Sequence, residues 1–155
     1  MKPQKNNSLN RFMRVMSFNI RYDAPSDYPQ NHWVKRRPYV AEIIKESQSD
    51  FVGIQESLNS QRSYLESQLE DYSSYGRTRE ESEEYGESCP IFYLHSKWKQ
   101  VAGDVFWFSD EPKKPGSKGW GNTLPRIATW GVFRNILEED NQLEVREFVK
   151  EKSKF

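Results

Sequence analysis

Two polar residues, Asn19 and Glu56, stand beside short apolar segments that are typical of strands. Asn19 lies within SFNIRY, and Glu56 ends FVGIQE. If these strands are parallel neighbours, their carboxyl ends meet at one edge of a sheet, where α/β sheets bind ligands. An amide oxygen and a carboxylate suit Mg²⁺, which keeps several waters and takes few protein ligands. The residues alone leave a structural interpretation open, in which Asn19 caps a turn and Glu56 is a solvated strand end.

The hydrophobic pattern predicts the elements that would carry this pair. Alternation over 15–20 favours a strand, and the short apolar run over 50–56 favours a buried one. Helical spacing predicts a helix over 33–47 and a second helix carrying three leucines. The apolar stripe of the first helix consists of Val34, Val40, Ala41, Ile43 and Ile44, and the leucines are Leu58, Leu65 and Leu69. Further strands are expected at 72–79, 90–95, 101–109 and 126–134.

This order of elements predicts an α/β layered fold whose later strands form hairpins. The hydrophobic content of 35% and charged content of 30% are typical of a chain that leans towards disorder. An aromatic content of 14% argues against that, because such residues supply a core. We therefore expect a folded domain with a thinly filled core.

Net charge, cysteine content and the absence of targeting segments bear on the partners and the compartment that the sequence predicts. Twenty-three basic and twenty-three acidic residues cancel, so net charge gives no support to nucleic acid as a partner, although it does not rule nucleic acid out. The single Cys89 excludes an internal disulfide framework. The sequence has no signal peptide and no apolar run long enough for a membrane span, so we expect a cytoplasmic protein.

A wider set of motifs gives these residues a context. Five motifs follow one another over residues 13–134. They are MRVMSFNIRYD, the W-x-x-R-R pattern at 33–37, SDFVGIQE, GESCPIFY and LPRIATWGVFR. In this order they resemble the endonuclease/exonuclease/phosphatase superfamily, which has the deoxyribonuclease-I-like fold. The resemblance implies a four-layer α-β-β-α sandwich and a hydrolase that uses Mg²⁺ or Mn²⁺ to cleave a phosphate ester, whether a monoester or a diester.

The resemblance also implies roles for individual residues. Glu56 matches the metal-binding glutamate of the family, and Asn19 matches the neighbouring asparagine that contacts metal-site water or phosphate. Glu87 matches a carboxylate that supports the catalytic histidine. Arg126 matches an arginine that reaches the scissile phosphate, and Tyr85 matches an aromatic residue that contacts the phosphate.

The sequence departs from the family after the PRIATW strand. The family continues with blocks that supply the catalytic histidine, an Asp–Asn pair and a final Asp–His pair, and none of these blocks is present. The two histidines, His32 and His95, lie upstream and are expected to be surface or structural residues. We therefore expect the N-terminal half of the domain at 13–134, after a disordered leader at 1–12.

Two functions remain open from the sequence. The first is a metal-dependent phosphoesterase that is incomplete and inactive as this chain alone, with its C-terminal half lost by a frameshift or encoded separately. The second is a non-enzymatic remnant or subunit that binds a metal or a phosphorylated ligand. The charged segment at 135–155 matches nothing in the family and is expected to be a tail.

Other features favour structural roles. The aromatic run at 106–108 is expected to pack in the core, and the acidic run at 80–87 is expected to be a solvated loop apart from Glu87. The lysines of the Pro/Gly-rich loop at 110–125 are expected to be solvated too.

Overall fold

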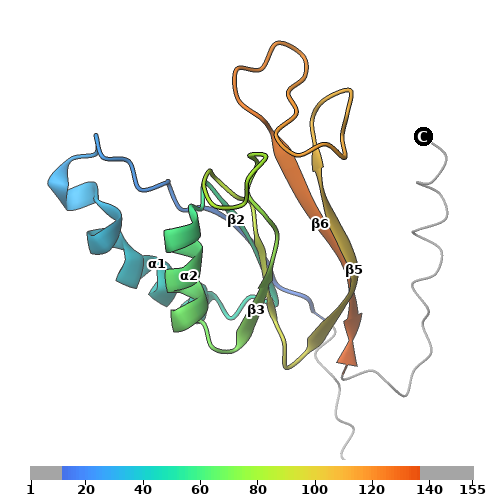
Figure 1. Ribbon diagram of the computed structural model, residues 1–155. Helices are drawn as coiled ribbons and strands as arrows, with labels where there is room; N and C mark the ends of the chain where they lie inside the picture. The colour runs from blue at the N-terminus through green and yellow to red at the C-terminus, as the bar shows by residue number, and fades with distance from the viewer. Residues whose placement is uncertain (1–11, 137–155) are drawn as a thin grey trace, which may run out of the picture.

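The structure is a computed structural model, and residues 12–136 of it are described (Figure 1). The expected leader up to residue 11 and the expected tail from residue 137 onward lie outside the described residues. The elements in chain order are β1 Val15–Asn19, the 3₁₀ turn η1 Pro29–Asn31, α1 Trp33–Ser47, β2 Phe51–Gln55, α2 Asn59–Gln68, β3 Tyr72–Tyr75, β4 Ile91–Leu94, β5 Trp98–Trp107 and β6 Ile127–Asn135. None of the described helices is long and apolar enough to cross a membrane.

A four-stranded sheet with the order β1-β2-β4-β3 forms the centre of the structure. Its β1 and β2 strands are parallel neighbours, which is the condition under which the sequence brings Asn19 and Glu56 together, while β4 runs antiparallel to both β2 and β3. The parallel pair needs a crossover connection, which α1 provides. Strands β5 and β6 pair separately as a long antiparallel hairpin.

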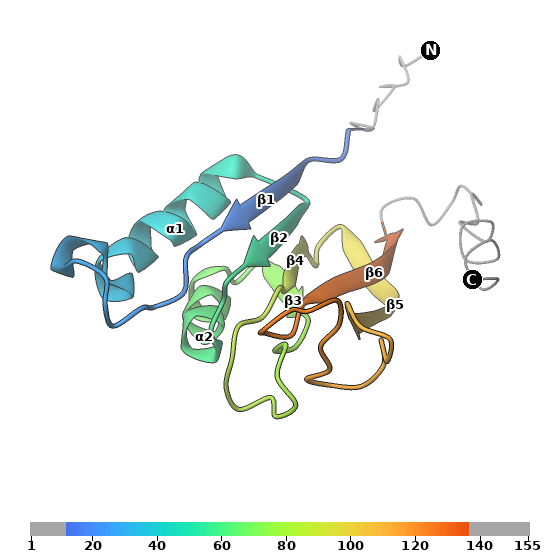
Figure 2. The same cartoon turned by 90° about the horizontal axis from the view of Figure 1, so that it is seen from above.

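The helices and the hairpin lie on opposite faces of this sheet. Both helices cover one face, and the hairpin stands on the other, so the described residues form three layers (Figures 1 and 2). Ring contacts join the sheet to the hairpin, with Phe51 packing on Trp98 and Phe133 at centroid distances of 4.9 Å. The expected α/β layering is confirmed among the described residues.

The main core lies between the helices and the sheet. Ile44 of α1, Leu65 of α2, Val52 of β2 and Phe92 of β4 are all fully buried there. Strand β2 is central and is covered on both faces, which explains why FVGI is a continuous apolar run and not an alternating one.

The apolar stripe of α1 differs from the prediction at two positions. Val40, Ala41 and Ile44 are buried as expected, whereas Val34 and Ile43 are 55% and 44% exposed. Each of these two residues is one position from a buried one, and one position turns a helix by about 100°. They therefore lie at the margins of the buried face, whose first residue is Trp33 and not Val34.

The expected bounds of two strands and the expected packing of the aromatic run also need correction. Strand β5 begins at Trp98, three residues before the expected start, and β3 ends at Tyr75 because Gly76 turns the chain with a φ of 142°. In the aromatic run only Trp107 is buried, while Phe106 and Phe108 are more than one third exposed. Successive strand residues point to opposite faces, so the expected core packing holds for the central residue alone.

A buried carboxylate joins the strands at the foot of the sheet. Asp50 is 4% exposed, and it accepts hydrogen bonds from the Arg14 amide at 2.8 Å and from Lys97 Nζ at 2.9 Å. Burial by itself would raise the pKa of Asp50, but the Arg14 amide and the Lys97 ammonium outweigh it and leave this pKa below its ordinary value. The Asp50 carboxylate therefore ties the start of β1, through a hydrogen bond, to the turn between β4 and β5, through an ion pair.

This ion pair predicts a pH-dependent loss of stability in Asp50→Asn. A lowered folded-state pKa contributes stability above the ordinary value of 3.8, and that contribution is lost as the pH falls through the folded-state pKa. Urea unfolding should show the largest difference between wild type and variant near neutral pH and a shrinking difference below about pH 4. A difference that stays constant down to pH 3 would contradict this role for the carboxylate.

The core predicts a large cost for Phe92→Ala. This side chain is fully buried, so its removal should lower the free energy of unfolding by about 3–5 kcal/mol. Tyr39→Ala is the matched control, since Tyr39 lies on α1 with 66% of its surface exposed and should change stability by less than about 0.5 kcal/mol. Equal losses in chemical denaturation would show that the core lies elsewhere.

Candidate active site

Parallel pairing of β1 and β2 brings Asn19 and Glu56 together at the carboxyl edge of the sheet. Asn19 lies opposite Gln55, and Glu56 is the next residue along. The Asn19 amide Nδ2 donates a hydrogen bond to Glu56 Oε1 at 2.9 Å. Asn19 is exposed and Glu56 is half-buried, so the pair is open to a ligand from one side.

A residue with left-handed backbone geometry follows shortly after each of the two strands. Glu56 has a φ of 60° and Arg21, two residues after Asn19, has a φ of 58°. Such conformations cost energy for residues other than glycine and cluster at functional sites. They turn the chain sharply here, so that the amide of Tyr22 donates to Glu56 Oε2 at 3.2 Å.

The carboxylate of Glu56 is therefore held at both oxygens. Asn19 donates to one oxygen and the Tyr22 amide donates to the other. Asn19 Oδ1 in turn accepts from the Arg21 amide at 2.9 Å, which fixes the orientation of the Asn19 side chain. Each carboxylate oxygen retains further acceptor capacity, and the Asn19 oxygen retains one lone pair.

Glu87 lies on the neighbouring segment and has its own partner. The backbones of Ser57 and Ser88 exchange hydrogen bonds, which places Glu87 beside the chain that follows Glu56. Arg79 Nη2 pairs with Glu87 Oε1 at 2.9 Å, and both side chains are largely buried. Sequence reasoning did not single out Arg79, because its partner is eight positions away across a loop.

Cys89 carries a partly buried free thiol. Burial, reinforced by the negative charge of Glu87, raises the pKa of the Cys89 thiol. A thiol with a raised pKa stays protonated near neutral pH and is a poor nucleophile.

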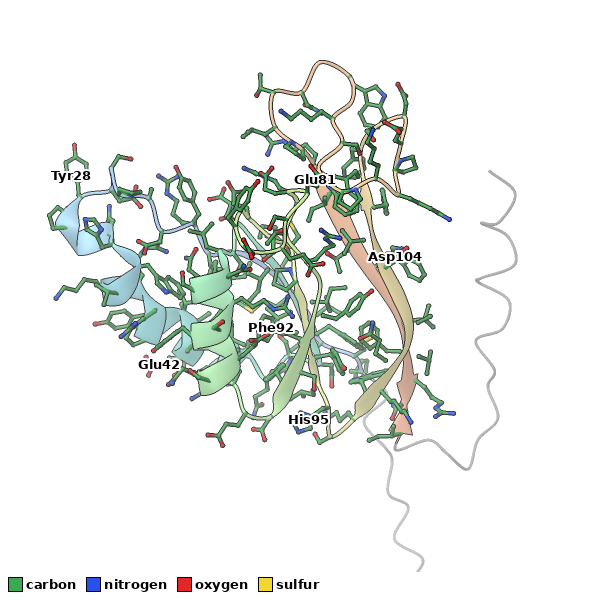
Figure 3. The ribbon with its side chains drawn as sticks, in the orientation of Figure 1. Tyr28, Glu42, Glu81, Phe92, His95 and Asp104 are labelled. Carbon is green, nitrogen blue, oxygen red and sulfur yellow. The ribbon has the colours of Figure 1, made fainter. Side chains whose placement is uncertain are left out.

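The acidic loop between β3 and β4 is anchored by the hairpin and is not simply solvated. The Arg77 guanidinium lies 5.2 Å from the centroid of the Trp107 ring and donates to the Glu81 carbonyl at 3.1 Å. Trp107 Nε1 donates to the Arg79 carbonyl at 2.6 Å. Figure 3 shows Glu81 at the end of the sheet that faces the hairpin loop. The hairpin thus fixes the segment that carries Arg79 and leads to Glu87.

Arg126 and Tyr85 are exposed on the loops at this end of the molecule. The Arg126 carbonyl accepts a hydrogen bond from the Phe108 amide at 2.8 Å, and its side chain is exposed at the start of β6. Tyr85 is 61% exposed in the loop between β3 and β4. No contact among the described residues joins either side chain to Asn19 or Glu56.

The two histidines lie at opposite ends of the sheet, and in residues 12–136 neither forms a hydrogen bond or ion pair with Asn19 or Glu56. His32 precedes α1 as its N-terminal flanking residue. His95 follows β4, and its amide donates to the Asp71 carbonyl at the foot of the sheet (Figure 3). Within residues 12–136, no group of three or more His, Cys, Asp or Glu side chains is arranged to hold a metal ion.

The W-x-x-R-R pattern has a structural role at this site. Arg36 lies over the Trp33 ring and donates to the carbonyls of Ile20 and Arg21. These carbonyls belong to the chain that leaves β1 just after Asn19. Arg36 of this motif therefore holds the loop that follows β1.

The fold is similar to that of several solved structures. An endonuclease/exonuclease/phosphatase from Bacteroides vulgatus matches with a TM-score of 0.76 and 36% sequence identity, over 79% of this chain and 47% of that one. The mannosyl-6-phosphatase of Bacteroides thetaiotaomicron VPI-5482 matches with a TM-score of 0.76 and 34% identity, over 80% of this chain and 46% of that one. ANGEL2, a 2′,3′-cyclic phosphatase, shares the fold with a TM-score of 0.58 and 19% identity, over 81% of this chain and 37% of that one.

This chain spans less than half the length of these three structures. No protein-family model and no curated protein matches the sequence.

The left-handed backbone at Glu56 predicts an unusual order of stability among its variants. Glu56→Gly and Glu56→Ala both lose the carboxylate, but only alanine keeps the steric cost of a positive φ. The glycine variant should therefore be more stable than the alanine variant by about 1 kcal/mol in urea unfolding. At Gln55, inside β2, the order should reverse, because glycine weakens a strand. The same order at both positions would contradict strain at Glu56.

Proposed function

The chain belongs to the endonuclease/exonuclease/phosphatase family, and we propose that it supplies one part of the active site of a metal-dependent phosphoesterase. In this proposal Glu56 binds Mg²⁺ or Mn²⁺, and Asn19 orients the carboxylate and contacts a water of the metal or an oxygen of the phosphate. One observation carries the proposal above the others. The Glu56 carboxylate is held by two donors on a left-handed backbone, at the sheet edge where α/β folds bind ligands.

The available donors suit a hard divalent ion that keeps most of its water. One carboxylate and one amide oxygen provide few protein ligands, which matches the preference of Mg²⁺ for one or two carboxylates and several waters. A structural zinc site would need nitrogen or sulfur ligands in a closed set of four. When bound, the metal would neutralise negative charge on the phosphate during hydrolysis.

The other site residues have roles that follow from their charge. Arg126 carries a fixed positive charge suited to phosphate oxygens, and its exposure leaves it free to reach a substrate. Tyr85 is a second exposed side chain for the phosphate. Glu87, held by Arg79, would orient a histidine that acts as the general base.

The relatives favour a phosphomonoester of a sugar as the first substrate to test. The mannosyl-6-phosphatase of Bacteroides thetaiotaomicron is 34% identical over 80% of this chain. We therefore propose a hexose 6-phosphate, ahead of nucleic acid, for which the balanced net charge offers no long-range attraction.

We propose that these residues alone do not complete the catalytic set. A general base must lie within hydrogen-bonding reach of the attacking water, and no hydrogen bond or ion pair in residues 12–136 joins His32 or His95 to Asn19 or Glu56. The base and further metal ligands would come from residues other than those that the structure places at this edge, on the same polypeptide or on a separate one.

A non-enzymatic role as a metal-binding or phosphate-binding subunit is the second candidate. It would use the same Asn19–Glu56 pair and the exposed Arg126 and would need no general base. The two candidates predict different results when a C-terminal half of a relative is added. The first predicts that phosphate-ester hydrolysis is restored, and the second predicts that it is not.

The proposal predicts weak metal binding without turnover. Mn²⁺ should bind the purified chain, and Glu56→Gln should abolish that binding because an amide replaces the carboxylate. Hydrolysis of mannose 6-phosphate and of a chromogenic phosphodiester should stay at the metal-only background. Addition of the C-terminal half of the Bacteroides thetaiotaomicron mannosyl-6-phosphatase should restore turnover, and the Glu56→Gln variant should remain inactive.

Three outcomes would change the assignment. Turnover by the chain alone would mean that it contains a base that is absent from the account above. Metal binding without restored turnover would favour the non-enzymatic role. Mn²⁺ affinity that is unchanged in Glu56→Gln would rule out Glu56 as the ligand.

A further inference from the structure

A fully buried glutamine lies beside the Asn19–Glu56 pair. Gln61 occupies the first turn of α2, and its side chain has no exposed surface. Glutamine is mostly exposed in folded proteins, and a buried polar side chain requires hydrogen-bond partners. The partners of Gln61 therefore show what this side chain holds in place.

The Gln61 side chain connects the loops that follow β1 and β2. Its Oε1 accepts from the amides of Asp23 and Leu58, each at 3.2 Å. Its Nε2 donates to the carbonyl of Arg21 at 2.9 Å. Leu58 lies two residues after Glu56, whereas Arg21 and Asp23 lie just after Asn19, so one side chain joins the two segments that carry the pair.

The loop held in this way contains the second donor to Glu56. Tyr22 lies between the two residues that Gln61 bonds, and its amide donates to Glu56 Oε2. Arg36 Nη2 shares the Arg21 carbonyl at 3.2 Å from the side of α1. The direction of the Tyr22 amide, and with it the orientation of the carboxylate, therefore depends on the bonds to Arg21 and Asp23.

We propose that Gln61 is a positioning residue for the Glu56 carboxylate. A helix cap alone would require only the bond to Leu58, three residues away. The other two bonds reach segments 38 and 40 positions away in the sequence, and they fix the backbone on both sides of Tyr22. The consequence for metal affinity rests on the proposed metal-binding function, whereas the consequence for the Tyr22 amide does not.

The test uses Gln61→Met, which keeps the length of the side chain and removes all three hydrogen bonds. Hydrogen exchange measured by NMR on the full chain should show faster exchange of the Tyr22 amide. Mn²⁺ affinity, followed by the electron paramagnetic resonance of free Mn²⁺, should fall roughly tenfold, as it does when other outer-shell partners of metal ligands are removed.

Arg62→Met is the matched control on the same helix. Arg62 bonds Ser74 and the Gly76 carbonyl on the side of β3, away from the Arg21–Asp23 loop. This variant should leave both the Tyr22 amide and Mn²⁺ affinity at wild-type values. If Gln61→Met does not fold, Gln61→Glu replaces it. The carboxylate keeps an acceptor for the amides of Asp23 and Leu58 and loses only the donor to the Arg21 carbonyl. Exchange of the Tyr22 amide should again be faster than in the wild type.

The outcomes separate this inference from the proposed function. Unchanged Tyr22 exchange in the Gln61 variant, or an equal increase in Arg62→Met, overturns the positioning role. Wild-type Mn²⁺ affinity in Gln61→Met, when the wild type does bind, overturns it too. A wild-type chain that binds no Mn²⁺ contradicts the proposed metal site, and Tyr22 exchange then decides the positioning role by itself.

Discussion

The parallel register between β1 and β2 is the constraint on which the rest of the site depends. It sets Asn19 opposite Gln55. Glu56 is the residue after Gln55, and its carboxylate is therefore within hydrogen-bonding distance of the Asn19 amide. Side chains alternate along a strand, so a slip of one residue would turn Asn19 towards the helices. The crossover through α1 and the burial of β2 on both faces hold this register, because each slip would also expose core residues.

Polar contacts then lock the two ends of the pair of strands. At the foot, Asp50 binds the amide that precedes β1 and the ammonium of Lys97. At the carboxyl edge, Arg36 and Gln61 hold the loop after β1 from two different helices. The strained turns at Arg21 and Glu56 persist because these contacts over-determine the backbone around them. Core packing therefore sets the register, and the buried polar side chains set the direction of the carboxylate.

Local pattern was enough to predict the elements with strong periodicity. The bounds of α1 are confirmed, and β1 and β2 meet the condition of parallel neighbouring strands under which the sequence brings Asn19 and Glu56 together. Long-range contacts were beyond such reasoning. The partners of Gln61 and Arg79 lie across loops, and nothing in the spacing of polar residues marks them. The exposure of Ile43 depends on how far α2 and the sheet extend, which helical periodicity does not define.

The most direct test of the account is the position of a metal ion in crystals of the chain grown with Mn²⁺. An anomalous difference map should show a peak at the carboxyl edge of β1 and β2, about 2.1 Å from an oxygen of Glu56. The peak should be absent from crystals of Glu56→Gln grown in the same way. A fully occupied Mn²⁺ elsewhere on the chain, with none at Glu56, would contradict the assignment of this edge as the metal site.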